Sequence, residues 1–405
     1  MHDDVRYLVN PAAAAPGEPY GARRAAVLNQ AGFDAAMAEV SSWPGYAPTP
    51  LARLPGLARS LGLGAVYYKD ECGRFGLKSF KALGGAYAVA RLLCARVAAA
   101  TGQTTVTSKR VLSGEFADLV GRLTVTCATD GNHGRSVAWG AQLFGCRCVI
   151  YVHETVSQGR RDAIARYGAD VREVRGNYDD AVRFAAATAA AEGWTVVSDT
   201  SYPGYRDIPT DVMHGYGVMA GEIGAQLADL PAPPTHVLAQ AGVGALAAAV
   251  CASFWLRWGA RRPRFITVEP LSADCVFRSL EAGRPVVVGG ALDTVMAGLA
   301  CGEVSELAWE ILAQGADAAV AIADRYALHA MRMFARPAPG DAALVAGETG
   351  GAGLGALLAA RDDAAMHEAL GLDADARVLL IGSEGDTDAA IYREVVGCDA
   401  SEVRR

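Results

Sequence analysis

The chain has 405 residues, a length that predicts about two domains rather than one small core. Hydrophobic residues make up 52% of it and charged residues 20%, and this balance excludes a largely disordered protein. The net charge of -7 argues against nucleic acid as the main partner, because nucleic-acid binding needs a basic surface.

Residues 1–50 are expected to form an irregular arm, because six prolines interrupt this segment and only one helix, near 25–39, is predicted in it. The chain starts with polar residues and has no apolar stretch of the kind that a signal peptide carries, so we expect a cytoplasmic protein. The longest apolar run, 245–256, is shorter than the ~20 residues that a membrane span needs. We therefore expect no membrane partner.

From residue 51 onward, predicted helices and strands alternate. The first are a helix at 51–61, a strand at 65–69 and a long helix at 79–100. The segment 97–122 interrupts the alternation, and we expect an insertion or a flexible lid there. Later strands are predicted at 124–128, 148–152, 170–174, 195–199, 236–240, 265–269 and 378–381, and later helices near 134–143, 158–167 and 178–192. This order predicts an α/β fold with mostly parallel sheets covered by helices on both faces.

Lysine is rare in this chain, and three of its four lysines, Lys69, Lys78 and Lys81, fall in one short segment. Arginine, the usual basic residue here, cannot form a stable Schiff base because its guanidinium stays protonated. A lysine amine can form one when its surroundings lower its pKa. Lys81 lies near the start of a predicted helix, and we interpret it as a reactive amine. Lys69 and Lys78 are expected to be solvated.

A glycine-containing turn at 129–134 connects a predicted strand to a predicted helix. Its backbone amides suit an anion such as the α-carboxylate of an amino acid, and Asn132 adds a side-chain amide. An alternative is a tight turn in which Asp130 only caps the helix. We expect four residues of this turn to bind a small amino-acid substrate: Thr129, Asp130, Gly131 and His133.

A second glycine turn, 242–247, follows the strand predicted at 236–240. With Glu269 at the end of the next strand, it matches a dinucleotide site, so an NAD-dependent dehydrogenase is one interpretation. A single phosphate ester is another, because such a backbone suits any phosphate group. Ser383 stands at the C-terminal end of the last predicted strand, where open α/β sheets bind ligands. The spacing of His and Cys residues indicates no metal site.

Together these features resemble the fold-type II pyridoxal phosphate enzymes, the tryptophan-synthase-β family. The resemblance rests on Ser79-Phe-Lys81, Gly131-Asn132 and the glycine turn at 242–245, which occur in the order and context of that family. It implies two three-layer αβα domains with mostly parallel sheets, a homodimer, and pyridoxal 5'-phosphate as the cofactor. The large domain would comprise residues 1–88 and 205–405, and the small domain residues 89–204.

The resemblance also implies a role for each motif. Lys81 would bind the cofactor as a Schiff base, Asn132 would contact its phenolic oxygen, and Ser383 would contact its pyridine nitrogen. The backbone amides of four residues would hold its phosphate: Gly242, Val243, Gly244 and Ala245. A neutral hydroxyl at the pyridine nitrogen makes the ring a weaker electron sink than a carboxylate would. This favours loss of a β-substituent over transamination.

Longer motifs between about residues 40 and 397 resemble those of the ammonia-lyases that act on 2,3-diaminopropionate. The resemblance implies α,β-elimination to pyruvate and ammonia. The β-amine is a poor leaving group unless an acid protonates it. Asp130 would act on the D-isomer and Asp199 on the L-isomer, while Lys81 would take the remaining proton transfers.

Three alternatives stay open at this point. The nearest is a serine or threonine dehydratase, or another β-eliminating enzyme of the same fold. The second is the NAD-dependent dehydrogenase, and the third is a non-catalytic binding protein that has kept the fold.

Overall fold

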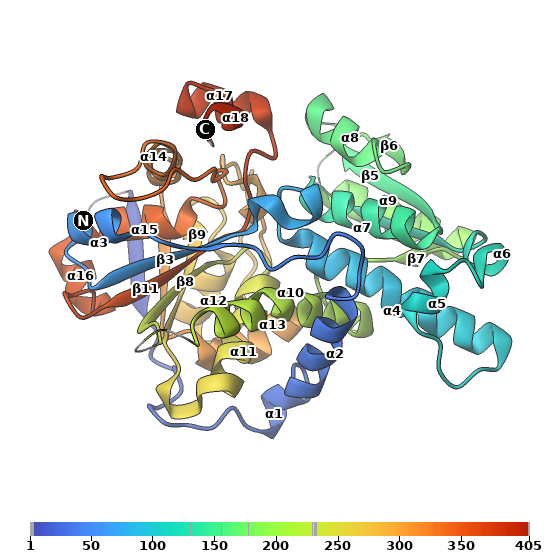
Figure 1. Cartoon of the computed structure of the whole chain (residues 1–405), viewed down its shortest axis with the longest axis horizontal. Helices are drawn as coiled ribbons and strands as arrows, with labels where there is room; N and C mark the ends of the chain where they lie inside the picture. The colour runs from blue at the N-terminus through green and yellow to red at the C-terminus, as the bar shows by residue number, and fades with distance from the viewer. Residues whose placement is uncertain are drawn as a thin grey trace. The chain divides into compact units, whose positions relative to one another are not determined.

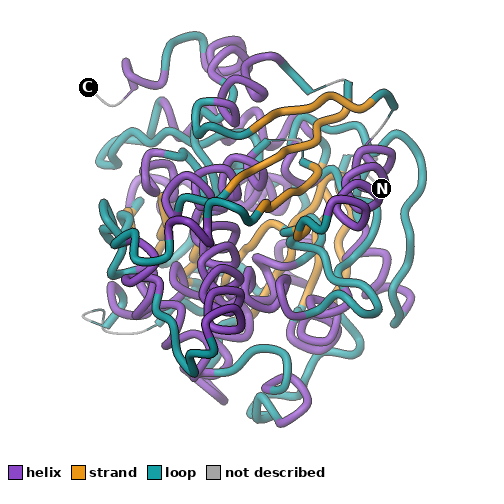
Figure 2. Tube along the Cα trace, turned by 90° about the vertical axis from the view of Figure 1, so that its right-hand side faces the viewer, coloured by secondary structure: helices purple, strands orange, loops and turns teal. Residues whose placement is uncertain are grey.

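The computed structural model describes residues 4–129, 131–154, 156–176, 178–228, 230 and 233–403 (Figure 1). The chain divides into two compact units. The first unit comprises Met1–Phe33, Ala47–Phe80 and Met219–Arg405, and the second comprises Asp34–Tyr46 and Lys81–Val218. Each unit has its own sheet, and Figure 2 shows the strands running side by side within the sheets, with helices around them.

The first unit is built on a seven-stranded sheet in the order β1-β10-β9-β8-β11-β3-β2. The inner strands are parallel, and the edge strands β1 and β2 are antiparallel to their neighbours. Every residue of β8 and β10 is buried, as expected for parallel strands covered on both faces. The strands are β1 (Val5–Val9), β2 (Leu51–Arg53), β3 (Ala65–Asp70), β8 (His236–Gln240), β9 (Arg264–Pro270), β10 (Ala318–Ile322) and β11 (Arg377–Gly382).

Helices cover both faces of this sheet. One face packs against α3 (Pro55–Leu61), α14 (Asp324–Ala335), α15 (Ala352–Arg361) and α16 (Ala364–Leu370), which share a hydrophobic core with the strands. The other helices and 3-10 turns of the unit are α1 (Ala22–Ala25), α11 (Ala245–Trp258), α12 (Cys275–Ala282), α13 (Glu306–Gly315), α17 (Ala389–Val396), α18 (Ala400–Val403), η1 (Glu71–Gly76), η2 (Gly259–Arg261) and η3 (Ala297–Leu299). The sheet with its two helix layers forms a three-layer αβα unit.

The second unit has a four-stranded parallel sheet in the order β6-β5-β4-β7. Its strands are β4 (Thr124–Ala128), β5 (Arg147–His153), β6 (Asp170–Val174) and β7 (Thr195–Val196). Helices α7 and α9 both pack on β4 and β5. The helices are α4 (Lys81–Thr101), α5 (Ser108–Leu112), α6 (Ala117–Val120), α7 (Asn132–Phe144), α8 (Gln158–Ala165) and α9 (Tyr178–Glu192). Two further helices lie partly in each unit, α2 (Gln30–Val40) and α10 (Asp207–Gln226).

Helices α4 and α7 approach each other closely through glycines. A Cβ atom at Gly140 would lie 2.8 Å from the Cα atom of Ala86, and one at Gly85 would lie 1.8 Å from the Oγ atom of Ser136. Only glycine therefore fits at these two contacts. The contacts run in the same direction along both helices, so both N-termini lie on the same side of the pair.

The segment 97–122 is not a separate flap. It contains the end of α4 together with α5 and α6, and its valines Val97, Val106, Val111 and Val120 are buried. Helix α4 is long and apolar enough to cross a membrane by length and composition, and 61% of its apolar window is buried. Buried core helices share these properties, so this is weak evidence for a membrane span.

Two of the elements expected before residue 62 are wrong. The helix predicted at 51–61 begins only at Pro55, because Leu51–Arg53 forms the edge strand β2 beside β3. The arm predicted to be irregular also contributes β1, which pairs with β10 more than three hundred residues away in sequence. Both are edge strands, and their pairing partners lie outside any local sequence window.

Candidate active site

Lys81 and Asp199 form a partly buried ion pair in the second unit. Lys81 is the first residue of α4, and its Nζ atom donates to the Oδ2 atom of Asp199. The same Nζ atom lies 5.7 Å from the ring centre of Tyr216, which belongs to α10. Burial alone would raise the pKa of Asp199, but the charge of Lys81 and its hydrogen bond hold that pKa well below its usual range. Asp199 is therefore ionised and able to accept a proton.

The backbone around Asp199 is fixed by two side chains. The hydroxyl of Tyr205 donates to the carbonyl oxygen of Val196 at 2.9 Å and accepts from the N–H of Ser198 at 2.9 Å. His133 Nε2 donates to the carbonyl oxygen of Val197 at 2.8 Å. The N–H of Val197 also donates to the carbonyl oxygen of Thr126 in β4 at 2.8 Å, so Asp199 stands on a defined backbone rather than a free loop.

His133 is the second residue of α7 and is buried. Burial lowers its pKa, although the carboxylate of Asp199 acts in the opposite direction. Its Nε2 proton is used by Val197, which leaves Nδ1 facing the Oδ2 atom of Asp199 at 3.7 Å. A neutral imidazole in this tautomer presents a lone pair to Asp199. Binding of substrate by His133 stays a prediction.

The turn at 129–134 is shaped by its own threonine. Thr129 Oγ1 accepts the N–H groups of Gly131 and Gly134, each at 3.0 Å. Asn132 begins α7 directly after the turn. Asp130, the predicted catalytic residue for the D-isomer, lies outside the described residues. The contacts that Thr129 and Gly131 would make with a substrate stay predictions.

The glycine turn of the first unit suits a phosphate group. It connects β8 to α11, and Gly244 adopts a left-handed φ of 90°. Among the described residues, the N–H groups of Gly242, Val243 and Gly244 donate to no other protein group. A Cβ atom at Gly242 would lie 3.1 Å from the carbonyl oxygen of Gly298, so the backbone is closely packed there. Free amides at a helix N-terminus form an anion site, which fits the predicted role of 242–245.

Ser383 lies directly after β11, the strand beside β8, so both loops leave the same edge of one sheet. Its side chain is buried, and its Oγ atom lies 2.9 Å from the Nε2 atom of Gln240. An amide nitrogen only donates, so the hydroxyl proton of Ser383 is left to donate elsewhere. The carbonyl oxygens of Thr349 and Ile381 hold the same amide nitrogen in place, at 2.8 Å and 2.6 Å.

Glu269 does not face the glycine turn, as a dinucleotide site would require. Its two carboxylate oxygens accept the N–H groups of Val276 and Phe277 at 2.8 Å and 2.7 Å, at the start of α12. The side chain is fully buried, and burial raises its pKa well above the usual range. Both oxygens therefore bind the backbone at the start of a helix. Glu269, the acidic residue on which the NAD interpretation relies, thus has a structural role.

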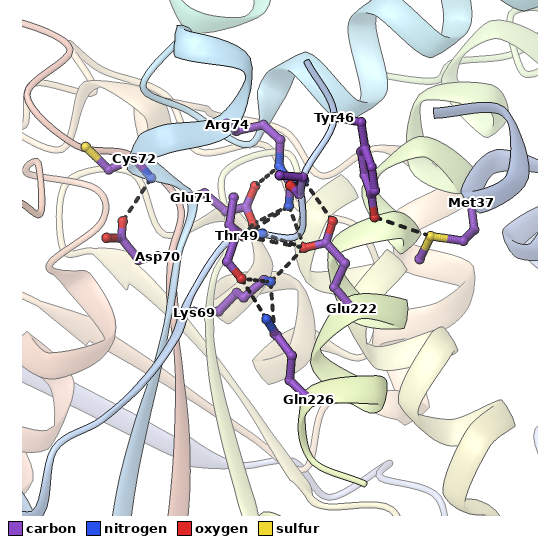
Figure 3. A network of polar contacts seen from close by, with 11 residues as sticks. Met37, Tyr46, Thr49, Lys69, Asp70, Glu71, Cys72, Arg74, Glu222 and Gln226 are labelled. Carbon is purple, nitrogen blue, oxygen red and sulfur yellow. Dashed lines mark hydrogen bonds and ion pairs between the residues drawn. The ribbon is translucent and has the colours of Figure 1, made fainter. Parts of the chain in front are cut away.

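Lys69 is not solvated as predicted. It is fully buried at the end of β3, where its Nζ atom donates to the carbonyl oxygen of Thr49 and to Glu222 Oε2, each at 2.7 Å (Figure 3). Lys78 has a side chain that is 42% exposed and forms an ion pair of 2.5 Å with Asp386. Among the described residues, no group of three His, Cys, Asp or Glu side chains is placed to hold a metal ion.

Three residues that contact the predicted site residues or their sequence neighbours were not predicted from the sequence motifs. Tyr205 and Tyr216 come from the segment 200–226, which carries no recognisable motif. Gln240 is the last residue of a predicted strand, and its polar side chain in a buried strand was the available signal.

Comparison with known proteins decides the family. A model of the family described as "Pyridoxal-phosphate dependent enzyme" matches residues 42–384. The chain belongs to this family. Membership confirms the predicted α/β fold of fold type II, the prediction of an enzyme, and pyridoxal phosphate as the cofactor. It also removes the dinucleotide interpretation of the glycine turn.

Several similar members of the family are diaminopropionate ammonia-lyases. Diaminopropionate ammonia-lyase of Escherichia coli strain K12 is 43% identical over 355 residues, covering 87% of this chain and 88% of that protein. The enzyme of the same name from Salmonella typhimurium is 38% identical over 405 residues, covering 98% of both. The E. coli enzyme in complex with an aminoacrylate-PLP azomethine reaction intermediate is a similar structure. It has a TM-score of 0.86 at 39% identity and covers 97% of this chain and 96% of that one.

Proposed function

We propose that this pyridoxal-phosphate dependent enzyme is an ammonia-lyase that acts on D- and L-2,3-diaminopropionate. With one water molecule, the reaction yields pyruvate and two molecules of ammonia. The observation that carries the proposal is the partly buried Lys81–Asp199 pair, in a chain that is 43% identical to a diaminopropionate ammonia-lyase over 87% of its length. A reactive amine beside an ionised carboxylate is the machinery that proton abstraction and leaving-group protonation need.

Residues of several sequence motifs would hold the cofactor. Lys81 would bind it covalently through its amine, and Asn132 would contact its phenolic oxygen. The amides of 242–245 would bind its phosphate, which is supported by their lack of protein acceptors among the described residues. Ser383 would donate a hydrogen bond from its hydroxyl to the ring nitrogen. When bound, the cofactor supplies an electron sink for the charge left after the Cα proton departs.

Ser383 directs the reaction toward elimination. Its neutral hydroxyl does not protonate the ring nitrogen, so the sink is weaker than one paired with a carboxylate. A short-lived negative charge at Cα favours departure of the β-amine over reprotonation at other positions. Gln240 holds the Ser383 hydroxyl in place without using its proton, which supports this role.

The proton transfers fall to the acidic residues and the lysine. Asp199 is ionised in the free enzyme because Lys81 stabilises its charge, so it is set up to take a proton from the L-isomer. Asp130 would serve the D-isomer in the same way, and Lys81 would carry the remaining transfers. The departing β-amine leaves as ammonia only after it is protonated, which one of these groups provides.

Pyruvate release from D- and L-2,3-diaminopropionate, compared with keto-acid release from serine and threonine, tests the proposal. We expect diaminopropionate to be the preferred substrate in both forms. Lys81→Ala serves as the control, because it lacks the amine and is expected to lose both the visible absorbance of bound cofactor and the activity. A clear preference for threonine or serine would contradict the proposal and favour the dehydratase alternative.

We also propose that the protein is a homodimer, as the family resemblance implies. We further propose that it is cytoplasmic. Light scattering of the purified protein tests the dimer. The division into a large domain of 1–88 with 205–405 and a small domain of 89–204 stays a prediction.

A further inference from the structure

The six residues that precede Lys81 form a strained loop, residues 75–80, which we call the approach loop. Among the described residues, only three that are not glycine have a left-handed φ, and two lie in this loop: Phe75 at 48° and Lys78 at 59°. Gly76 between them has a φ of 73°. An L-residue in this region brings its Cβ atom too close to its own backbone, so such strain persists only where the surroundings enforce it.

A buried charge network holds the start of the approach loop. It consists of Thr49, Lys69, Glu71, Arg74, Glu222 and Gln226, all in the first unit (Figure 3). Arg74, the last residue before the loop, donates to Glu71 through Nε and Nη2 and to Glu222 through Nη1 and Nη2, each at 2.8 Å. This double fork fixes the plane of the guanidinium and ties η1 to α10.

The network leaves little freedom because its donors are satisfied. Lys69 Nζ donates to Thr49, Glu222 and Gln226, which uses its three protons. Arg74 has further acceptors in the carbonyl oxygen of Ala47 at 3.2 Å and in Thr49 Oγ1 at 3.1 Å. Two cations face two carboxylates, so the buried charges balance. The start of the approach loop is thus joined to the segment before β2, to β3 and to α10.

The segment 383–386 holds the other end of the loop. The N–H of Phe80 donates to the carbonyl oxygen of Ser383 and the N–H of Gly385 to that of Lys78, both at 3.0 Å. The Nζ atom of Lys78 also pairs with Asp386. This segment is itself closely packed, since a Cβ atom at Gly385 would lie 1.9 Å from the Sγ atom of Cys72. The approach loop therefore ends against the backbone that carries Ser383.

We propose that Arg74 and its network, together with segment 383–386, are positioning elements that hold the approach loop in its strained form and so place Lys81 for attachment of the cofactor. Lys81 directly follows Phe80, so the conformation of the approach loop determines the position of the Lys81 backbone. Backbone strain lowers the stability of the fold. Because the strained residues lie directly before the reactive lysine, we assign the strain a role in positioning that lysine. This inference rests on the proposed function, in which Lys81 binds pyridoxal phosphate.

A glycine at position 78 makes the inference testable, because glycine tolerates a left-handed φ without strain. Arg74→Lys keeps the charge but loses the fork that grips two carboxylates. After removal of the cofactor, we expect this variant to regain the visible absorbance of bound pyridoxal phosphate roughly tenfold more slowly than the wild type. Adding Lys78→Gly removes the strain that drives the loop out of place, and is expected to restore most of that rate.

Lys78→Ala is the matched control. It loses the same amine as Lys78→Gly but keeps a Cβ atom, so in the Arg74→Lys background it is expected to restore nothing. Pyruvate release is measured alongside, and kcat is expected to follow the absorbance while KM changes little. Equal recovery with glycine and alanine would overturn the inference, as would an Arg74→Lys protein that takes up cofactor at the wild-type rate.

A second variant covers the case in which Arg74→Lys does not fold by circular dichroism. Asp386→Asn loosens the other end of the loop from a partly exposed position. Slow uptake that is restored by Lys78→Gly and not by Lys78→Ala would again support the inference, and unchanged uptake would overturn it. A wild-type protein that neither takes up pyridoxal phosphate nor releases pyruvate would contradict the proposed function as well. Failure of the glycine rescue alone contradicts only the positioning role.

Discussion

At the scale of single residues, the chemistry depends on how Asp199 keeps its charge while buried. Removing a carboxylate from water favours its protonated form, and an isolated buried aspartate would be neutral. The Lys81 amine reverses this preference because it lies in direct contact with Asp199 Oδ2. The proposed attachment of the cofactor to Lys81 would change the charge on that amine, so the proton affinity of Asp199 would be coupled to the state of Lys81.

Asp199→Asn is expected to slow pyruvate release from L-2,3-diaminopropionate by about 10²-fold or more, because the amide cannot take up or supply the proton. Release from the D-isomer is expected to fall far less, since Asp130 would serve it. Steady-state kinetics with each isomer measures the difference. Equal losses for the two isomers would refute the division of work between Asp199 and Asp130.

The same variant reports on the pKa of Asp199 in the protein without cofactor. A carboxylate whose pKa is lower in the folded state adds stability above its unfolded pKa of about 3.9. That stability is lost as the pH falls from about 4 toward the lower folded value. Asp199→Asn lacks this contribution, so its thermal midpoint is expected to fall less steeply with acid than that of the wild type. Parallel acid profiles of the two proteins would show that the ion pair contributes nothing to folding.

Local sequence predicts residues of the candidate site only where they lie in motifs. Lys81, Asn132, the turn at 242–245 and Ser383 all lie at strand ends or helix starts, where glycine and polar residues follow an apolar run. Their partners carry no such mark. Tyr205 reaches Ser198 across a turn, and Gln240 reaches Ser383 over more than a hundred residues. Such contacts depend on the folded chain and not on its local pattern.

At the scale of elements, the loop after β7 shows how a side chain can replace a strand partner. The sequence predicts a strand at 195–199, but β7 ends at Val196. Beyond it, the Tyr205 hydroxyl bonds to the backbone on either side of Val197, and the rings of Tyr202 and Tyr205 stack at 5.0 Å. A β-rich stretch such as Val196-Val197 predicts a strand, and it does not reveal that a tyrosine hydroxyl binds the backbone groups of Val196 and Ser198.

Tyr205→Phe is expected to destabilise the protein by about 1–3 kcal/mol, because it leaves the Val196 carbonyl and the Ser198 N–H without their partner. It is also expected to lower kcat for the L-isomer, since Asp199 follows directly after Ser198. Thermal unfolding and steady-state kinetics measure the two effects. Tyr202→Phe is the matched control: it keeps the stacked ring pair, its side chain is largely exposed, and it is expected to change neither quantity.

At the scale of the whole molecule, the alternating elements predicted the fold class, and the parallel inner strands confirm it. The prediction failed where the first unit joins distant segments, as at β1 and in the buried charge network. Lys69 is the last residue of the predicted strand, and its sequence neighbours indicate a solvated end. Its carboxylate partner, Glu222, lies 153 residues further on. A buried ion pair across such a separation leaves no periodic signal, because each partner alone resembles a surface charge.

The contribution of the buried charge network to the free energy of unfolding is expected to depend on the balance of its charges rather than on their number. Glu222→Gln leaves two cations facing one carboxylate out of water, and we expect it to lower the free energy of unfolding by about 3–5 kcal/mol. Adding Lys69→Met removes one cation and leaves Arg74 paired with Glu71, so the double variant is expected to be more stable than Glu222→Gln alone. Urea unfolding of the two single variants and the double variant gives the coupling energy. If the double variant loses as much unfolding free energy as the two single variants together, Lys69 and Glu222 act independently. The network would then not hold η1 as one coupled unit.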